Sequence, residues 1–167
     1  MQTLEGQRTR TDVGLSSEAT TAIAAGLNRY LSELHVLYTK LHNYHWNIEG
    51  NSFYTLHEEL QKLYEAVAEE IDEVAERALK IGHRPLARMS DYLESAELSE
   101  SESRGYEGGE VASTLIGDYR FLTDNLRELI RRAQEHGDEG TADDAIGWLK
   151  DKEKAIWMLS AYSGYSG

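Results

Sequence analysis

Two histidines and two carboxylates are the residues of this chain that could bind a metal ion. His45 ends one predicted helix, and His57, Asp72 and Glu76 lie on the next one. Together with Gln61, the positions on the second helix fall within about 100° of one another, so they form one polar stripe. Imidazole nitrogen combined with carboxylate oxygen suits Fe(II), Zn(II) or Mn(II) better than Ca(II). The chain has no Cys, which excludes thiolate ligands.

This polar stripe is too long to serve one metal ion within a single chain. His57 and Glu76 are separated by roughly 28 Å along the helix axis, and Gln61 and Asp72 by about 16 Å. Both pairs are centred on the same point, between residues 66 and 67. If the helix packs antiparallel against its own copy, a two-fold contact brings His57 to the other chain's Glu76 and Gln61 to its Asp72. The spacing therefore predicts a homodimer with two metal sites, each built from both subunits.

Simpler interpretations of the same residues remain open. A single histidine on a helix is more often structural or solvated, and runs of acidic residues usually form solvated faces. The acidic run here consists of Glu69, Glu70, Asp72, Glu73 and Glu76. No histidine has a glutamate three residues before it, so the Glu-x-x-His di-iron motif of helical bundles is absent. A dimer interface that carries these residues without binding metal is also consistent with the pattern.

Apolar residues spaced three or four apart predict the elements that position the stripe. They mark four long helices, at about Glu18–Trp46, Phe53–Ile81, Glu110–His136 and Ala142–Ala161. The connection over residues 82–109 is rich in Ser, Glu and Gly, and Asp91–Ala96 within it could form a short helix. Two helices, a long crossover and two more helices predict an all-α fold, a ferritin-like four-helix bundle.

Composition sets the broad class of the protein. The 167 residues suit one domain, with tails over residues 1–16 and 162–167. The formal net charge is −13, from 30 acidic and 17 basic residues, and it should repel nucleic acid and anionic membranes while attracting cations. The acidity could equally reflect a solvated surface or a salty cytoplasm. No apolar run approaches the ~20 residues of a membrane span, and the polar start lacks a signal peptide, so we expect a cytoplasmic protein.

The segment from Leu41 to Arg77 resembles the Dps-like proteins, small relatives of ferritin named for DNA protection in starved cells. The resemblance rests on fixed offsets between short motifs and extends to the last helix. These motifs are His45-Trp46-Asn47-Ile48-Glu49-Gly50, Phe53, Leu56-His57-Glu58, Asp72, Ala75-Glu76-Arg77 and Lys154-Ala155-Ile156-Trp157-Met158-Leu159. The resemblance implies a dodecameric hollow shell with ferroxidase sites at its two-fold interfaces. It also implies that Fe(II) is oxidised, usually by hydrogen peroxide, and stored as ferric mineral, which limits oxidative damage and needs no organic cofactor.

The resemblance also implies a role for each residue of the site. His45 and His57 come from one subunit, and Asp72 and Glu76 come from its mate, with Glu76 as the main carboxylate. Gln61 departs from the family, which commonly has Asp there. Its neutral carbonyl should hold a second iron more weakly, or through water.

Further positions match secondary features of the family. Trp46 and Trp157 match aromatic positions near the site, although core packing explains them equally well. Acidic residues at the last interhelical turn resemble those that line the family's three-fold pore. Two other acidic residues resemble the carboxylates on which mineral forms inside the shell. For both groups, the alternative is an ordinary solvated surface. The pore candidates are Asp138, Glu139 and Asp143, and the nucleation candidates are Glu58 and Glu59.

The remaining expectations concern partners and activity. The first 16 residues are formally neutral and the residues after Tyr162 carry no basic side chain, so we expect weak or no DNA binding at physiological salt. The leading hypothesis is a peroxide-linked ferroxidase that stores iron. The alternatives are a zinc- or iron-binding shell with little catalysis, and a purely structural helical oligomer.

Overall fold

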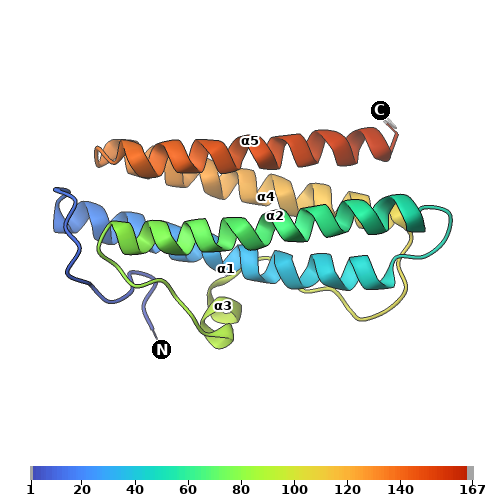
Figure 1. Cartoon of the computed structure of the whole chain (residues 1–167), viewed down its shortest axis with the longest axis horizontal. Coiled ribbons are helices and arrows are strands. Elements are labelled where there is room, and N and C mark those ends of the chain that lie inside the picture. Colours follow the sequence, from blue (N-terminus) through green and yellow to red (C-terminus); the bar gives the residue numbers. More distant parts are fainter. Residues whose placement is uncertain (1, 165–167) are drawn as a thin grey trace.

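A computed structural model describes residues 2–164, which form four long helices and one short helix. The helices are α1 (Ser17–Asn47), α2 (Phe53–Lys80), α3 (Met89–Ser95), α4 (Gly108–Glu135) and α5 (Glu139–Tyr162). The four long helices lie side by side, and α4 runs in the same direction as α2 because the crossover returns the chain along the bundle (Figure 1). The predicted all-α bundle with a short helix in its crossover is therefore confirmed. None of the helices within residues 2–164 is long and apolar enough to cross a membrane.

Local signals explain where the helices begin and end. Ser16 caps α1 because its side chain accepts a hydrogen bond from the backbone nitrogen of Ala19, at 3.1 Å. Gly50, with φ of +84°, makes the turn between α1 and α2. Asp138 caps α5 by accepting from the backbone nitrogen of Thr141, at 3.0 Å, so α5 begins three residues before the predicted start.

The core contains apolar residues spaced three or four apart from all four long helices, but the buried face of α5 also carries a lysine. In α5, Ile146 and Leu149 are only partly buried, whereas Trp148 and Lys152 are 5% and 3% exposed. The sequence prediction missed this rotation of the helix because a lysine would ordinarily face water. Of the partly buried apolar side chains of α5, Leu149 and Ile156 still pack against the core.

Buried polar contacts connect α2 to α5. Lys152 forms an ion pair with Glu70, which is 6% exposed and also accepts a hydrogen bond from the phenol of Tyr30. The indole nitrogen of Trp148 donates to Glu73 at 2.7 Å. Burial raises the pKa of Glu70, and the ammonium of Lys152 opposes that rise. Glu70 is therefore part of the interior, which corrects its assignment to a solvated acidic run.

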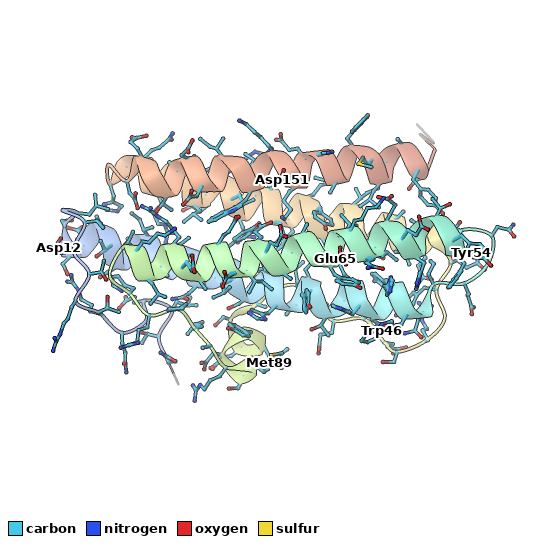
Figure 2. All side chains as sticks on the ribbon, in the orientation of Figure 1. Asp12, Trp46, Tyr54, Glu65, Met89 and Asp151 are labelled. Atoms are coloured by element: carbon cyan, nitrogen blue, oxygen red, sulfur yellow. The ribbon has the colours of Figure 1, made fainter. Side chains whose placement is uncertain are left out.

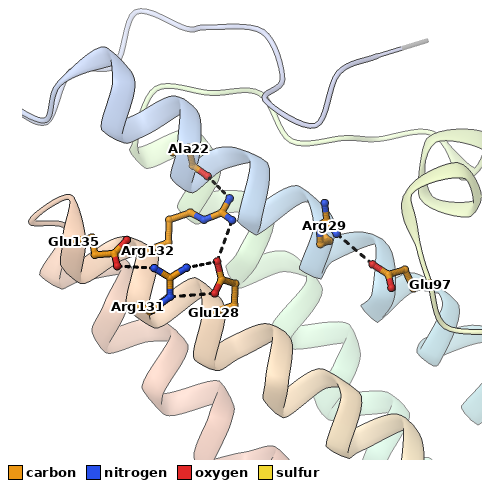
Figure 3. A network of polar contacts seen from close by, with 7 residues as sticks. All are labelled: Ala22, Arg29, Glu97, Glu128, Arg131, Arg132 and Glu135. Carbon is orange, nitrogen blue, oxygen red and sulfur yellow. Dashed lines mark hydrogen bonds and ion pairs between the residues drawn. The ribbon is translucent and has the colours of Figure 1, made fainter.

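Side chains of α1 and α4 fasten the surrounding segments to the bundle. Glu33, fully buried in α1, accepts hydrogen bonds from the backbone nitrogens of Glu97 and Leu98, at 2.8 and 2.9 Å. Arg29 adds an exposed ion pair to Glu97 at 3.2 Å, and Arg132 of α4 donates to the backbone oxygen of Ala22 in α1 (Figure 3). The crossover is thus anchored along the outer side of α1.

The N-terminal residues, predicted as a tail, lie against the beginning of the crossover. The backbone of Thr9 donates to Gly82 and that of Arg84 donates to Gln7, both at 2.8 Å. Asn28 donates to the backbone oxygen of Leu4 at 2.7 Å. Gly82 has a φ of +85°, and a side chain there would meet the backbone oxygen of Thr11 at 2.5 Å. Glycine at this position therefore permits the close approach of the two segments.

Candidate metal site

His45 and His57 form an interlocked pair at the junction of α1 and α2. Nδ1 of His45 lies 2.7 Å from the backbone oxygen of His57, and Nδ1 of His57 lies 2.8 Å from the backbone oxygen of His45. A carbonyl only accepts, so each Nδ1 must carry the proton and donate it. In the neutral rings both Nε2 atoms then keep a free lone pair. Metal-binding histidines typically have this arrangement, with one nitrogen fixed by a carbonyl and the other available to the ion.

The geometry of the two rings favours two adjacent metal positions over one shared ion. The imidazoles stack with centroids 3.8 Å apart and planes inclined by only 18°. A nitrogen lone pair lies in the plane of its ring, so lone pairs in two nearly parallel, stacked planes cannot both aim at one ion. One imidazole for each of two neighbouring ions satisfies the geometry, and paired ions in two-metal sites are separated by about 3.5–4 Å.

A set of aromatic rings holds this pair in place, and the sequence analysis did not identify it. Phe53 stacks on His57 with centroids 4.9 Å apart, and the rings of Tyr64 and His45 pack nearly perpendicular with centroids 5.3 Å apart. His42 stacks on Tyr64 with centroids 4.0 Å apart. The sequence did contain a signal for this cluster of rings. Residues 42 and 45 share one face of α1, and residues 57 and 64 share one face of α2.

The turn after His45 is fixed from outside by the end of the crossover. The backbone of Tyr106 donates to Asn47 and accepts from Glu49, both at 3.0 Å. The ring of Tyr106 also packs against that of Tyr44, which is buried beside His45. The backbone on both sides of His45 is therefore held by α1 packing and by the crossover.

Asp72 and Glu76 lie on α2, exposed and away from the histidine pair of the same chain. In residues 2–164 no three His, Asp or Glu side chains converge on one point. One subunit thus offers an imidazole pair at one end of α2 and a carboxylate pair towards the other. That a second copy of α2 completes each site stays a prediction of the spacing argument.

Gln61 lies on the same exposed face, between the two ends. Its Nε2 donates to Oε1 of Glu65 at 2.8 Å, a contact that was not anticipated from the sequence. Because a carboxylate only accepts, the amide nitrogen must face Glu65, and the carbonyl oxygen is turned away from it.

Both tryptophans singled out from the sequence are exposed. Trp46 is 69% exposed and Trp157 is 63% exposed, so neither packs in the core of this chain (Figure 2 shows Trp46). Trp46 lies 5.2 Å from His42, ring to ring, and so adjoins the aromatic set beside His45.

The acidic groove between α2 and α5 contains several of the remaining candidates. A cavity of about 430 Å³ is lined by Glu73, Glu76 and Asp143, and by Asp144 and Asp151, which the sequence analysis had not selected. It therefore connects a pore candidate with the proposed metal ligand on α2.

Further along the groove, Glu59 lines a larger cavity of about 470 Å³, whereas Glu58 is exposed and does not line it. At the last turn, Asp138 is 4% exposed and accepts from the guanidinium of Arg77 at 2.8 Å as well as capping α5. The carboxylates that remain available to a pore there are Glu139 and Asp143, both exposed.

Comparisons with known proteins cover nearly the whole chain. The family profile described as Ferritin-like domain matches residues 24–165. A DNA protection during starvation protein from Porphyromonas gingivalis is 41% identical over 157 residues, which are 90% of this chain and 94% of that protein. The crystal structure of a Dps protein from Bacillus brevis superposes with a TM-score of 0.86 at 37% identity, covering 90% of this chain and all of that one. A Dps structure from Vibrio cholerae O1, described as a member of a broad superfamily of ferritin-like diiron-carboxylate proteins, gives a TM-score of 0.88 at 31% identity over 95% of this chain and 100% of that one.

Proposed function

Because the chain belongs to the Dps-like proteins of the ferritin-like family, we propose that it assembles into an iron-storing cage that oxidises Fe(II) at sites shared between subunits. The observation that carries the proposal is the interlocked pair of His45 and His57, whose free Nε2 atoms lie at one end of the stripe that carries Asp72 and Glu76 at the other. We propose a dodecamer built from two-fold dimers, located in the cytoplasm.

In each proposed site, His45 and His57 of one subunit face Asp72 and Glu76 of the partner subunit. The imidazoles supply nitrogen and the carboxylates supply negative charge, which neutralises the ions and favours the higher charge of Fe(III). Hydrogen peroxide is the expected oxidant, with O₂ as the alternative. Two Fe(II) ions each give one electron, and one peroxide with two protons becomes two waters. The acidic groove between α2 and α5, with Glu59 in it, is a candidate surface for ferric mineral, and Glu139 and Asp143 are candidates for the entry of Fe(II).

DNA binding is not expected to be part of the function at physiological salt. The net charge of −13 opposes it, and the first 16 residues are formally neutral.

Stopped-flow oxidation of Fe(II) by anaerobic protein tests the proposal, with hydrogen peroxide and O₂ added separately. We expect oxidation faster than in a protein-free control and faster with peroxide than with O₂. Replacing His45 or His57 by Ala should abolish the acceleration, whereas His136→Ala, at the far end of α4, should leave it unchanged. Acceleration that survives both site substitutions would contradict the assignment.

A second candidate, a zinc- or iron-binding shell with little catalysis, is favoured by Gln61. A neutral amide in place of a charged oxygen weakens the second metal position, and oxidation of paired Fe(II) depends on that position. In this case Zn(II) would bind to the protein, but Fe(II) would be oxidised no faster than in the control.

A further inference from the structure

We propose that Glu65 acts through Gln61 as a positioning residue for the second metal ion, orienting the Gln61 carbonyl and supplying the negative charge that Gln61 lacks. The inference rests on the proposed metal site and adds to it a residue outside the ligand set. Glu65 lies on the exposed face of α2, near the middle of the helix (Figure 2).

The hydrogen bond between the two side chains fixes which atom Gln61 can offer to a metal. The carboxylate of Glu65 has no proton to donate, so it binds the NH₂ group of Gln61, at 2.8 Å. Glu65 lies one helical turn after Gln61, and His57 lies one turn before it. With its nitrogen held by Glu65, the amide has its oxygen on the other branch, free for an ion that His57 also binds. Without Glu65 the amide would rotate freely and present either group.

The charge of Glu65 is available for this role. Its neighbour Lys62 is bonded to Glu59 at 2.5 Å, and within residues 2–164 no Lys, Arg or His forms an ion pair with Glu65. Around the helix, Glu65 is displaced from Gln61 by only about 40°, so the two side chains share the stripe that a partner α2 would cover. Covering them would remove water and strengthen the attraction between this carboxylate and a cation.

A carboxylate that bonds to a metal ligand matters because it fixes the orientation of that ligand and adds negative charge near the ion. Removing such a partner typically weakens metal binding about 10- to 100-fold. The substitution of a charged ligand by Gln61 is then offset, in part, by a carboxylate placed one turn further along the helix.

A double-substitution cycle at positions 61 and 65 tests the proposal without any redox turnover. The assembled protein is titrated calorimetrically with Zn(II), and with Co(II) to record the visible spectrum of the bound ion. Glu65→Gln should weaken the second binding step about tenfold and leave the first within about twofold. Glu69→Gln, an exposed carboxylate one turn further on, is the matched control and should change neither step.

Glu65→Gln should not weaken the second binding step when position 61 carries aspartate. The introduced carboxylate would bind the metal directly, has no N–H for Glu65, and would be repelled by a like charge one turn away. In the Gln61→Asp background, Glu65→Gln should therefore leave the second step unchanged or strengthen it. Circular dichroism and the assembly state of each variant establish that the helix and the oligomer are retained.

Three results would overturn the proposal. These are an unchanged second step in Glu65→Gln, equal weakening in both backgrounds, and a wild-type protein that binds only one ion per site. In each of these the first binding step survives, and the proposed metal site with it. A wild-type protein that binds no ion at all would instead refute the proposed function, and this inference would fall with it.

Discussion

Replacing Lys152 by Met would leave a buried carboxylate without its charge partner. Glu70 is 6% exposed and Lys152 is 3% exposed, so water replaces little of the lost interaction, and the Tyr30 hydrogen bond alone remains. Breaking a buried ion pair by removing one partner typically costs about 3–5 kcal/mol. For a chain of this length, about 2–4 °C of melting temperature corresponds to each kcal/mol, so we expect a loss of roughly 6 to 20 °C.

The assay is thermal unfolding of metal-free protein, followed by circular dichroism at one fixed protein concentration because assembly contributes to stability. Lys150→Met is the matched control, since Lys150 is an exposed lysine on the same helix. Its effect should stay within about 0.5 kcal/mol. Adding Glu70→Gln to Lys152→Met removes the stranded charge but keeps an acceptor for Tyr30, and should recover most of the loss.

The deficit should also depend on pH, with a definite sign. Burial already raises the pKa of Glu70 above its ordinary value of 4.5, and loss of the Lys152 ammonium raises it further. A carboxyl with a raised folded pKa loses stability as pH rises through that pKa. The deficit of Lys152→Met should therefore be small below pH 4.5 and grow towards neutral pH. The reasoning would be refuted if Lys152→Met stayed within about 1 kcal/mol of wild type at neutral pH, about a third of the lower estimate. It would also be refuted if the double variant were less stable than Lys152→Met alone.

Three further predictions follow from other features. Asp138→Ala removes the α5 cap, worth about 1 kcal/mol, and one charged hydrogen bond of Arg77, which keeps its bond to Thr141, so unfolding should be easier by about 2–3 kcal/mol. Glu139→Ala, measured in the same melts, should change stability much less. Gly82→Ala puts a side chain against the backbone of Thr11 and should release the N-terminal segment, seen as faster hydrogen exchange of residues 7–11 while α1 to α5 keep their protection; unchanged exchange would contradict the docking role. In gel shifts the protein should fail to retain DNA at physiological salt, and a tight complex that resists salt would show that the charge argument is wrong.

Features encoded by periodicity were predictable from the sequence, whereas features made by distant segments were not. The long helices follow from apolar residues three or four apart, and their ends were displaced by only a few residues. The largest displacement, at the start of α5, arose because Gly140 in its first turn hides the cap that Asp138 provides. The burial of Glu70 and Lys152 was missed because each residue alone is typical of a surface, and only the fold brings them together.

The shared helix face of the candidate ligands could be read from the sequence, whereas their detailed contacts could not, and their binding of a metal stays a prediction. The stripe of His57, Asp72 and Glu76 was visible because helical geometry converts spacing into position. The two bonds from each imidazole to the other histidine's backbone oxygen were not visible, because they depend on how the turn between two helices closes. The same holds for the bond from Gln61 to Glu65, since i,i+4 side chains are within reach of each other but need not pair.

The reciprocal bonds between His45 and His57 have a consequence for how quickly metal arrives. Many metal sites assemble only when the ion binds, and the protein must then search for a bound conformation. Here backbone carbonyls of the chain itself hold the two imidazoles proposed as ligands, so no tautomer exchange and no ring flip need precede coordination. The rate of capture should then be set by diffusion of the ion and loss of its waters, giving one rapid kinetic phase that depends linearly on metal concentration.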